Sequence, residues 1–451
     1  MEQSLTATIA NYAAGTDLSA IPEVVRLRAR HIIFDEMASA HFGRRSPAGA
    51  LAASYAATMG GNGPALVLGT GKRLSPPYAA LANGTAGHGE EVDGAHVVGG
   101  HPGATIVHAA LAVAEHQRCT GADLLNAVVL GYDIGTRLVA ACGGKFVVRD
   151  RHHLNSDLLY ALGGAAAAAR LLGLGAERQC HAMGLATFQT NALYALYSEK
   201  RHISKSLCNG QFAFGGVSAA LMSAAGLEGN ADILGAEHGL LETWGADNAR
   251  DVVAAGLGRD FAVMEANFKF INAGYPIHTA TEAAMRLVTE HGIEPATITT
   301  ITVGMPSRAM RVVNNREMHN ICVQDMVAAS LALGHLRIDA QPFPAVLDDP
   351  LFRQLRGRIA VAVDAEIERQ NPNGRGAHVT IERAGQTPVS LRIDHPRGHC
   401  QRGGVTWDDL AGKWRGVLQG CDVAAAQNVA ERMEDIDDIR ELTRHFVGPY
   451  G

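Results

Sequence analysis

The sequence predicts a two-domain protein, in which a large all-α helical bundle is joined to a smaller α/β (α+β) domain. A chain of 451 residues is longer than one hydrophobic core usually holds. Residues 1–265 carry helical hydrophobic patterns, strand-like segments follow after about residue 295, and helical patterns return from Thr406 onward. We therefore expect a helical domain over 1–265, completed by 400–451, and an α/β domain over 266–399.

The N-terminal region contains a series of apolar helical patterns. Pro22 suits the first position of a helix, and apolar residues recur after it at the helical period. Further helices are expected at 104–115 and 124–131. The segment 163–172 (GGAAAAARLL) consists mostly of small residues, with Arg170 its single charged residue. Because small side chains let helices approach closely, we place this helix at the centre of the bundle rather than on the surface.

The region after residue 295 predicts the smaller domain. β-Branched residues throughout 297–303 are typical of a strand, and a second strand is expected at 359–363. The segments 377–381 and 389–393 flank Gly-Gln-Thr-Pro, which predicts a β-hairpin. Between these strands, 323–333 is expected to be helical. In the tail, Thr406 is expected to cap a helix whose first turn holds two aspartates.

Composition and charge exclude several classes of protein. Hydrophobic residues make up 47% of the chain and charged residues 19%, as in globular rather than disordered proteins. The net charge of −6 offers no general attraction for nucleic acid. The seven cysteines show no C-x-x-C spacing, so we expect reduced thiols and a cytoplasmic location. The N-terminus lacks a signal-peptide pattern, and apolar stretches are interrupted before the ~20 residues of a membrane span, so no membrane is expected.

The densest group of polar residues is GHGEEVDGAHVVGGHPG, residues 87–103, directly before an apolar helix. A glycine-rich loop at a helix N-terminus can present N–H groups to an anion, and carboxylates and imidazoles beside it can move protons. The simpler alternative is a solvated loop with a helix cap. A metal site is a less favoured third alternative, because His88, Glu90, His96 and His101 match no standard ligand spacing.

Two further polar clusters are basic. The first, residues 198–210, precedes another small-residue helix and holds Lys200, Arg201, His202 and Lys205. The second, residues 267–283, places Lys269 and His278 around a Gly-Tyr-Pro turn at the expected domain junction. A cleft between domains is a common place for a small-ligand site. The alternative is again a solvated turn, but three such clusters together suit a small polyanion.

In their order and spacing, these motifs resemble the MmgE/PrpD family, which includes 2-methylcitrate dehydratase, cis-aconitate decarboxylase and iminodisuccinate epimerase. The resemblance covers nearly the whole chain. It rests on four segments: IPEVVRLRARHIIFDEMASA, like the family's opening helix; ALANGTAGHGEEVDGAHVVGGHPG, like its N-G-x-x-x-H-x-x-D-x-D-D loop and His-Pro step; LGGAAAAARLLGL, like the helix after its second His loop; and HPRGH with VTWDDLAGKW, like its Y-P-K-G-H and L-T-x-E-E-L.

The resemblance implies a helical domain with the smaller domain inserted as a lid, an interdomain active site, a homodimer and no required cofactor. Glu91 and Asp93 fall on acidic positions of the family's first loop, His101 on its His-Pro histidine, and Lys205 on the lysine of its T-K-P turn. The junction positions of the family, a Lys and a His nine residues apart, fall on Lys269 and His278.

Several positions depart from the family pattern. Glu91 replaces an Asp, and Gly94 and Ala95 stand where an Asp and a hydroxyl residue are usual, which removes two polar groups. The second histidine loop reads RHHLNSD where His-Pro is usual, which leaves open whether its first or second histidine, His152 or His153, faces the site. Two more departures are Asp325 in place of a Tyr and Cys208 in place of a His.

Together these residues suggest proton transfer beside a carboxylate of a small di- or tricarboxylic acid of the 2-methylcitrate/aconitate type. His101 is expected to act as general acid or base, with Glu91 orienting it or as a second acid–base group, and His153 as a candidate on the opposite face. Lys205 is expected to stabilise an enolate-like charge. Both His101 and Lys205 are expected in polar loops outside the core. The expected substrate contacts are Lys269, His278, Asp93, His96 and Arg201.

Three functions stay open at this stage. The first is a cofactor-independent lyase, either a dehydratase or a decarboxylase. The second is an isomerase or epimerase of a dicarboxylate on the same scaffold. The third is a non-catalytic binder of an acidic metabolite, which the lost polar groups of the first loop would suit. The cysteine spacing gives no support to an iron–sulfur cluster of the aconitase kind.

Overall fold

The computed structural model describes residues 4–189, 191–200, 203–335, 337–338 and 346–448. Contacts within the chain divide it into two compact units. Unit 1 comprises Met1–Asn267 and Thr406–Gly451, and unit 2 comprises Phe268–Val405. The sequence predicts domain boundaries after residues 265 and 399, and the two units are divided after residues 267 and 405.

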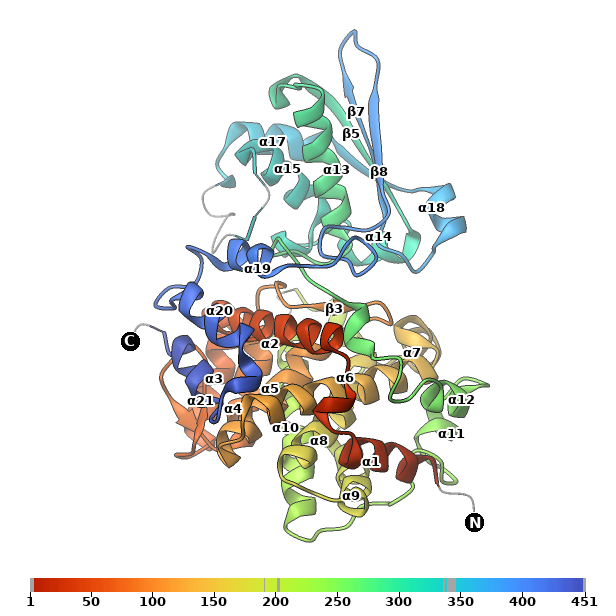
Figure 1. The fold of residues 1–451 in the computed structure, drawn as a ribbon. Helices are drawn as coiled ribbons and strands as arrows, with labels where there is room; N and C mark the ends of the chain where they lie inside the picture. Colours follow the sequence, from red (N-terminus) through yellow and green to blue (C-terminus); the bar gives the residue numbers. More distant parts are fainter. Residues whose placement is uncertain (1–3, 190, 201–202, 336, 339–345, 449–451) are drawn as a thin grey trace. The chain divides into compact units, whose positions relative to one another are not determined.

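Unit 1 is mostly helical (Figure 1). The helices of its longer segment are α1 (Leu5–Gly15), α2 (Glu23–Gly43), α3 (Pro47–Met59), α4 (Pro76–Gly87), α5 (Pro102–Gln117), α6 (Gly121–Ala141), α7 (Gly144–His152), α8 (Tyr160–Leu171), α9 (Ala176–Ala186), α10 (Ile203–Ala224), α11 (Leu240–Trp244) and α12 (Ala249–Ala254). The expectation of helices alone in this segment was wrong at two short antiparallel ladders. They pair β1 (Ala65–Leu66) with β2 (Arg73–Leu74), and β3 (Ala95–His96) with β4 (Ala266–Asn267).

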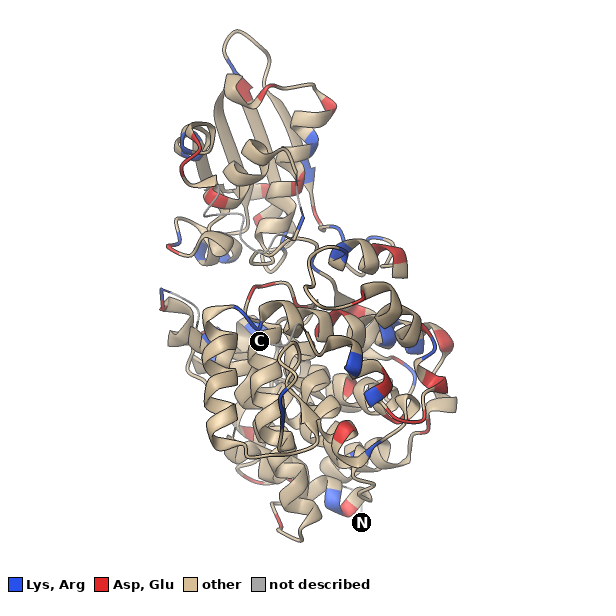
Figure 2. Ribbon diagram, turned by 90° about the vertical axis from the view of Figure 1, so that its left-hand side faces the viewer, with Lys and Arg blue, Asp and Glu red and all other residues tan. Residues whose placement is uncertain are grey.

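The small-residue helix α8 lies at the centre of unit 1, as expected from its composition. It packs against α5, α6, α9 and α10, and among its residues Arg170 alone is not buried. A Cβ atom added to Gly163 would lie 2.4 Å from the carbonyl oxygen of Gly131 on α6. Glycine is therefore required for this close helix contact. Figure 2 shows long stretches of these helices without any charged residue.

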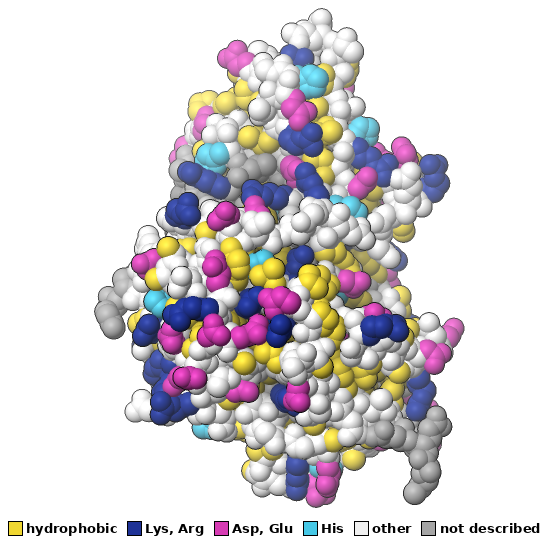
Figure 3. All heavy atoms as spheres, in the orientation of Figure 1, with side chains coloured by type: hydrophobic (Ala, Val, Ile, Leu, Met, Phe, Trp, Pro, Cys, Tyr) yellow, Lys and Arg dark blue, Asp and Glu magenta, His cyan; other side chains and the backbone are white. Residues whose placement is uncertain are grey.

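One helix in the described part of the chain, α6, is long and apolar enough to cross a membrane, and 89% of that apolar window is buried inside the structure. A core helix of a globular domain passes the same test. The expectation that every apolar stretch is interrupted too early was wrong here, because Gly131 and Gly135 continue the helix instead of ending it. Figure 3 shows acidic, basic and hydrophobic side chains interspersed on the face of unit 1 that it presents.

Unit 2 contains a four-stranded sheet of order β6-β5-β7-β8. Its strands are β5 (Ile298–Met305), β6 (Ile359–Val363), β7 (Ala377–Arg383) and β8 (Val389–Ile393), and its helices are α13 (Ile277–Glu290), α14 (Ser307–Val313), α15 (Val323–Leu333), α17 (Pro350–Gly357) and α18 (Ala365–Gln370). β5 pairs with β6 in parallel and with β7 antiparallel, while β7 and β8 form the predicted hairpin. α13 and α15 pack on each other, with α13 against β7 and β8.

The C-terminal segment completes unit 1 with α19 (Trp407–Trp414), α20 (Val423–Glu431) and α21 (Arg440–Thr443). Thr406 and Asp409 form a capping box at the start of α19, which confirms the predicted cap. Both α19 and α20 contact α2, and Figure 1 shows the blue C-terminal helices close to the red α2.

A buried ion pair fastens α19 to α2. Lys413 Nζ lies 2.7 Å from Asp35 Oδ1 and donates a further hydrogen bond of 2.9 Å to the carbonyl oxygen of Val92. Trp414 Nε1 donates to the same Asp35 oxygen at 2.8 Å. Burial raises the pKa of Asp35, while Lys413 and Trp414 oppose that shift. The pair therefore joins three separate parts of the chain: α2, the loop before β3 and the C-terminal segment.

We predict that Lys413→Met destabilises the protein strongly. The substitution keeps most of the side-chain volume but leaves Asp35 buried without its cation, which typically costs about 3–5 kcal/mol. Chemical denaturation followed by circular dichroism measures the free energy of unfolding. Lys72→Met, at an exposed lysine of the same unit, is the matched control and should change it by less than about 0.5 kcal/mol. Equal stabilities of the two variants would contradict a structural role for the pair.

Candidate active site

The loop between α4 and α5 connects two largely buried helices, and most of its polar side chains are buried as well. His88, Glu91, Asp93 and His101 expose 1%, 4%, 0% and 6% of their surface. This burial excludes the alternative of an ordinary solvated loop. Charged groups that are buried must be paired, so the partners of these side chains decide what the loop can do.

Asp93 lies between two imidazoles. His88 Nδ1 donates to its carboxylate at 2.9 Å, and His101 Nδ1 lies 3.0 Å from the same oxygen. His101 Nδ1 also donates to the carbonyl oxygen of Gly94 at 2.9 Å. The two rings lie with centroids 4.2 Å apart. Because the Nδ1 atoms of both histidines face Asp93, each ring can exchange a proton with another group only through Nε2, and Nε2 of His88 contacts Lys205.

Lys205 brings a positive charge to the other side of His88. Its Nζ donates to Glu91 Oε1 at 2.5 Å and contacts His88 Nε2 in a short hydrogen bond. A hydrogen bond between two nitrogens requires one of them to lack a proton, so the pair can hold or release one. Glu91 Oε1 also lies 3.3 Å from His88 Nε2. Tyr197 completes this side, with its ring centroid 5.6 Å from Lys205 Nζ.

The protonation of His88 reflects these neighbours. Burial and the charge of Lys205 disfavour its charged form, but the carboxylates of Asp93 and Glu91 outweigh these effects and raise its pKa. An imidazole with a raised pKa, in hydrogen-bond contact with a lysine, suits general acid–base chemistry.

Glu91 is held in an unusual backbone conformation. Its φ of 55° lies in the left-handed region, which a residue with a long side chain rarely adopts. The hydrogen bond to Lys205 accounts for the position of its carboxylate. Such local strain tends to occur at functional sites, where the surrounding structure holds it in place.

The structure places Lys205 inside a helix and not in a loop. It lies in the first turn of α10 with 6% of its surface exposed, and His101 directly precedes α5 with a similar exposure. The expectation that both residues stand outside the core was therefore wrong. The sequence alone could not show that the loop before α5 and the start of α10 pack on each other.

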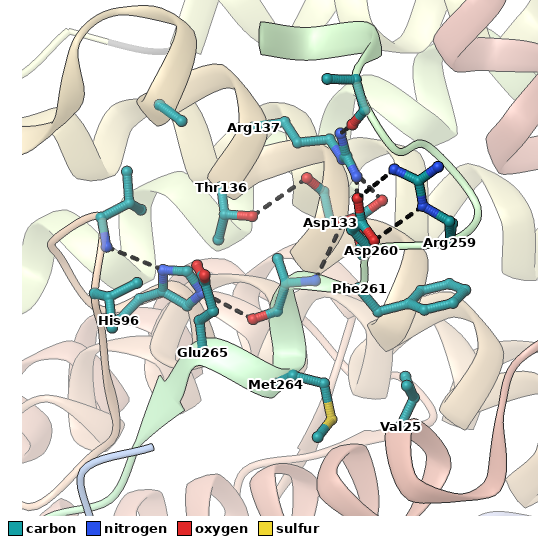
Figure 4. A pocket seen from close by; sticks show the side chains of 15 residues that line it. Val25, His96, Asp133, Thr136, Arg137, Arg259, Asp260, Phe261, Met264 and Glu265 are labelled. Carbon is teal, nitrogen blue, oxygen red and sulfur yellow. Dashed lines mark hydrogen bonds and ion pairs between the residues drawn. The ribbon is translucent and has the colours of Figure 1, made fainter. Parts of the chain in front are cut away.

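His96 has structural partners. Its Nε2 donates to the carbonyl oxygen of Ala262 at 2.8 Å, and its Nδ1 accepts from the backbone N–H of Val98 at 3.3 Å. Burial lowers the pKa of His96 to about 4, so the ring is neutral at pH 7. It lines a pocket of about 650 Å³ in unit 1, whose Arg137 and Arg259 bond to neighbouring groups of the protein (Figure 4). This geometry gives no support to the predicted substrate contact of His96.

His153 lies at the C-terminal end of α7 with its side chain exposed and its φ at 58°. Among the described residues its imidazole forms no hydrogen bond or ion pair with the cluster around Asp93. Its neighbour His152 is half-buried. Arg201 lies outside the described residues. The predicted roles of His153 and Arg201 therefore stay predictions.

The predicted junction residues belong to unit 2. Lys269 is fully buried, and His278 Nε2 lies 3.1 Å from the carbonyl oxygen of Ala273. Asp325, which replaces a Tyr of the family, is buried and pairs with His319 at 2.7 Å and with Arg356 at 2.5 Å. The predicted substrate contacts of Lys269 and His278 stay predictions.

Among the described residues, one group has the geometry to hold a metal ion: His88, Asp93 and His101. One ligand atom of each lies within 4.8 Å of the others. However, Lys205 Nζ contacts His88 Nε2, and a cation bound there would be repelled by this ammonium at short range. The arrangement fits a hydrogen-bonded acid–base cluster better than a metal centre.

Sequence reasoning missed three contributors to this site. His88 was counted in the polar loop without a role, although it lies between Asp93 and Lys205. Tyr197 lies beside Lys205 and carried no signal in the sequence. Glu36, in α2, is buried against Gly94. A signal for Glu36 existed, since Asp35 and Glu36 are adjacent acids inside the otherwise apolar run HIIFDEMASA.

Comparison with models of protein families shows two matches that together cover most of the chain. The model of the MmgE/PrpD N-terminal domain matches residues 7–251, and that of the MmgE/PrpD C-terminal domain matches residues 272–439. The protein therefore belongs to the MmgE/PrpD family.

Three curated relatives match the chain along nearly their whole length. Cis-aconitate decarboxylase of Homo sapiens is 24% identical over 470 residues, covering 100% of this chain and 96% of the relative. The Mus musculus enzyme of the same name is 25% identical, covering 100% and 94%. A cis-aconitate decarboxylase-like protein of Aspergillus oryzae is 24% identical, covering 98% and 97%.

We predict that Lys205 and Glu91 stabilise the protein as a pair. Lys205→Met leaves Glu91 buried without its ammonium and should cost about 3 kcal/mol, at the lower end for a buried pair because His88 can take a proton instead. Adding Glu91→Gln removes the unpaired charge and should restore a large part of that loss. A double-mutant cycle by chemical denaturation measures this coupling. Additive effects of the two substitutions would contradict it.

Proposed function

We propose that the protein is a cofactor-independent lyase of the MmgE/PrpD family, acting on a small di- or tricarboxylic acid of the aconitate type. The observation that carries this proposal is the buried cluster of Asp93 with His88, His101, Glu91 and Lys205. It combines a fixed cation with two imidazoles in a chain similar along its length to cis-aconitate decarboxylases. Either decarboxylation or dehydration could use this cation and these two imidazoles.

The chemistry of both reactions needs one cation and one proton carrier. In decarboxylation the bond from carbon to a carboxylate breaks, CO2 leaves, and its electron pair passes to the remaining carbon skeleton, which then takes up one proton. In dehydration a base removes a proton beside a carboxylate, and the hydroxyl leaves with a proton from an acid. Negative charge develops next to a carboxylate in each case and must be stabilised away from water.

Lys205 and His101 supply these two functions in our proposal. The Lys205 ammonium, already balanced by Glu91, would bind a carboxylate or the developing negative charge. His101, with Nδ1 committed to Gly94 and Asp93, would deliver or remove a proton through Nε2. Asp93 would stabilise the imidazolium that forms, in the way a buried carboxylate supports a catalytic histidine.

A screen of candidate acids for turnover tests this proposal. The protein is incubated with cis-aconitate, citrate, 2-methylcitrate and a chiral dicarboxylate in deuterated water, and products are followed by NMR. Loss of CO2 or water from one acid supports a lyase. Exchange or inversion without loss of a group would replace the lyase by an isomerase, and saturable binding without turnover would leave a binder. A parallel sample with chelator should keep its activity; loss of activity restored by one divalent ion would overturn cofactor independence.

We further propose that the protein forms a homodimer through unit 1. Leu51, Tyr55 and Met59 follow one another at four-residue spacing on α3, and they expose 60%, 53% and 53% of their surface. Residues at this spacing lie on one face of a helix. A row of large exposed apolar side chains is a feature of association surfaces, and a second copy of the chain is the partner we propose for it.

Replacing His101 with Asn should abolish turnover while the protein stays folded. The Asn side chain keeps a donor near the position of Nδ1 but removes Nε2, so we expect kcat to fall by about 100- to 10,000-fold with a small change in KM. Rates are measured on the acid found in the screen, and thermal melts confirm folding. The matched control, His116→Asn at an exposed histidine in the last turn of α5, should keep both the rate and the melting temperature. A near-normal rate for His101→Asn would remove this residue from the chemistry.

Replacing Leu51 and Tyr55 together by Asp should dissociate the homodimer, since each subunit would then bury two charges in an apolar interface. Sedimentation velocity at micromolar concentration measures the mass against that of the 47.5 kDa chain. Leu227→Asp, at another exposed leucine of unit 1, should leave the dimer intact. A wild-type protein sedimenting only as a monomer would refute the dimer, and a dimer unaffected by the double substitution would place its interface elsewhere.

A further inference from the structure

Glu36 is a buried carboxyl group that the proposed reaction does not use. It lies in α2 with 1% of its surface exposed, next to Asp35. Its Oε1 accepts a hydrogen bond of 3.0 Å from the backbone N–H of Gly94. Its Oε2 is buried and has no hydrogen-bond partner among the described residues. A buried carboxyl group with so few partners is costly, so its retention in the core calls for a physical reason.

The other buried carboxylates nearby each have a cation or an imidazole. Asp35 has Lys413, Glu91 has Lys205, and Asp93 has two histidines. Glu36 forms no ion pair with a described residue. Burial and the charges of Asp93 and Asp35 raise its pKa well above the ordinary value, which outweighs the opposing effects of the Gly94 N–H and Lys413. These effects favour the neutral, protonated form of Glu36, which accepts through Oε1 without adding a charge beside Asp93.

Two glycines provide the space for this carboxyl group. A Cβ atom on Gly103, in the first turn of α5, would lie 2.2 Å from Glu36 Oε1. A Cβ atom on Gly94 would lie 3.2 Å from the same oxygen. Neither residue has a positive φ, so space rather than backbone conformation favours glycine at both positions. The resemblance places an Asp at the position of Gly94. In this chain the loop lacks that acid, and the carboxyl group of Glu36, from α2, lies beside the same position.

The contact with Gly94 links Glu36 to His101. Gly94 donates a hydrogen bond through its N–H to Glu36 Oε1, and its carbonyl oxygen accepts the hydrogen bond of His101 Nδ1 at 2.9 Å. A glycine between these two bonds has no side chain to fix its own orientation. The carboxyl group of Glu36 therefore restrains the backbone at Gly94, whose carbonyl oxygen shares the Nδ1 proton of His101 with the carboxylate of Asp93.

We propose that Glu36 is a positioning residue for His101: through Gly94 it keeps the imidazole in the Nδ1–H tautomer and directs Nε2 to the substrate. The catalytic part of this inference rests on the proposed function, in which His101 transfers a proton. The tautomer itself does not, because it is a property of the protein without substrate. Glu36 takes no part in proton transfer, and a neutral amide at its position should serve equally well.

Two variants separate positioning from proton transfer and from simple packing. Glu36→Gln keeps an oxygen that accepts from Gly94 and carries no charge. Glu36→Leu keeps similar volume but removes the acceptor. Protein labelled with 15N-histidine reports the tautomer of each ring through its nitrogen shifts, and the signals of His101 are assigned by their absence from His101→Asn. We expect the Nδ1–H tautomer of His101 in wild type and in Glu36→Gln, and a mixture of tautomers in Glu36→Leu.

The kinetic arm uses the acid identified in the substrate screen. Glu36→Gln should keep kcat within about twofold and leave its pH profile in place, whereas Glu36→Leu should lower kcat by about 100-fold, the scale of a small misplacement of a catalytic group. KM should change little in both. If Glu36→Gln lost as much activity as Glu36→Leu, Glu36 would be a proton carrier and the proposal would be overturned.

An unchanged His101 tautomer in Glu36→Leu overturns the proposal even if no substrate is found. A protein that shows the expected tautomers but acts on no acid would refute the proposed function alone, and a Glu36→Leu variant that fails to fold leaves the decision to Glu36→Gln.

Discussion

The buried ion pair of Lys413 and Asp35 is the interaction on which the rest of unit 1 depends. It joins the C-terminal segment to α2, and its third hydrogen bond, to the carbonyl oxygen of Val92, holds the loop one residue before Asp93. A buried charge without its partner costs several kcal/mol, so these parts of the chain are stable only together. In the sequence, the whole of unit 2 lies between the acid–base loop and Lys413. The contact that holds this loop therefore comes from the C-terminal segment of unit 1.

The candidate site is arranged by the same requirement that buried charges be matched. Lys205 balances Glu91, and the two imidazoles share the carboxylate of Asp93. Glu36 forms no ion pair with a described residue, and burial together with the charges of Asp93 and Asp35 favours its protonated form. A fixed lysine beside two imidazoles is what a reaction with charge developing next to a carboxylate needs, and this is the physical basis of the proposed lyase.

These contacts explain how the site accommodates two departures from the family pattern, at Glu91 and Gly94. Glu91 is one methylene longer than the usual Asp, and its left-handed backbone and the hydrogen bond to Lys205 together place its carboxylate. The loss of an acid at Gly94 coincides with a carboxyl group from α2 in the adjoining space. The polar character of the loop is thus altered rather than lost, which argues for an active protein more than for a binder that has lost its site.

The sequence by itself determined the family, the helical N-terminal region, the sheet segments of unit 2 and the return of the C-terminal tail to helix. These features are carried by local patterns: small residues in α8, β-branched runs in β5, and the Thr406 cap of α19. It also indicated His101, Glu91, Asp93 and Lys205 as site residues, through motifs that resemble the family. Only the tertiary structure decided which of them meet. Contacts such as Lys205 with Glu91, or Glu36 with Gly94, join residues 114 and 58 positions apart, and no local pattern encodes distances of that kind. Burial was likewise decided by packing, because a polar loop becomes part of the core only when helices distant in the sequence close over it.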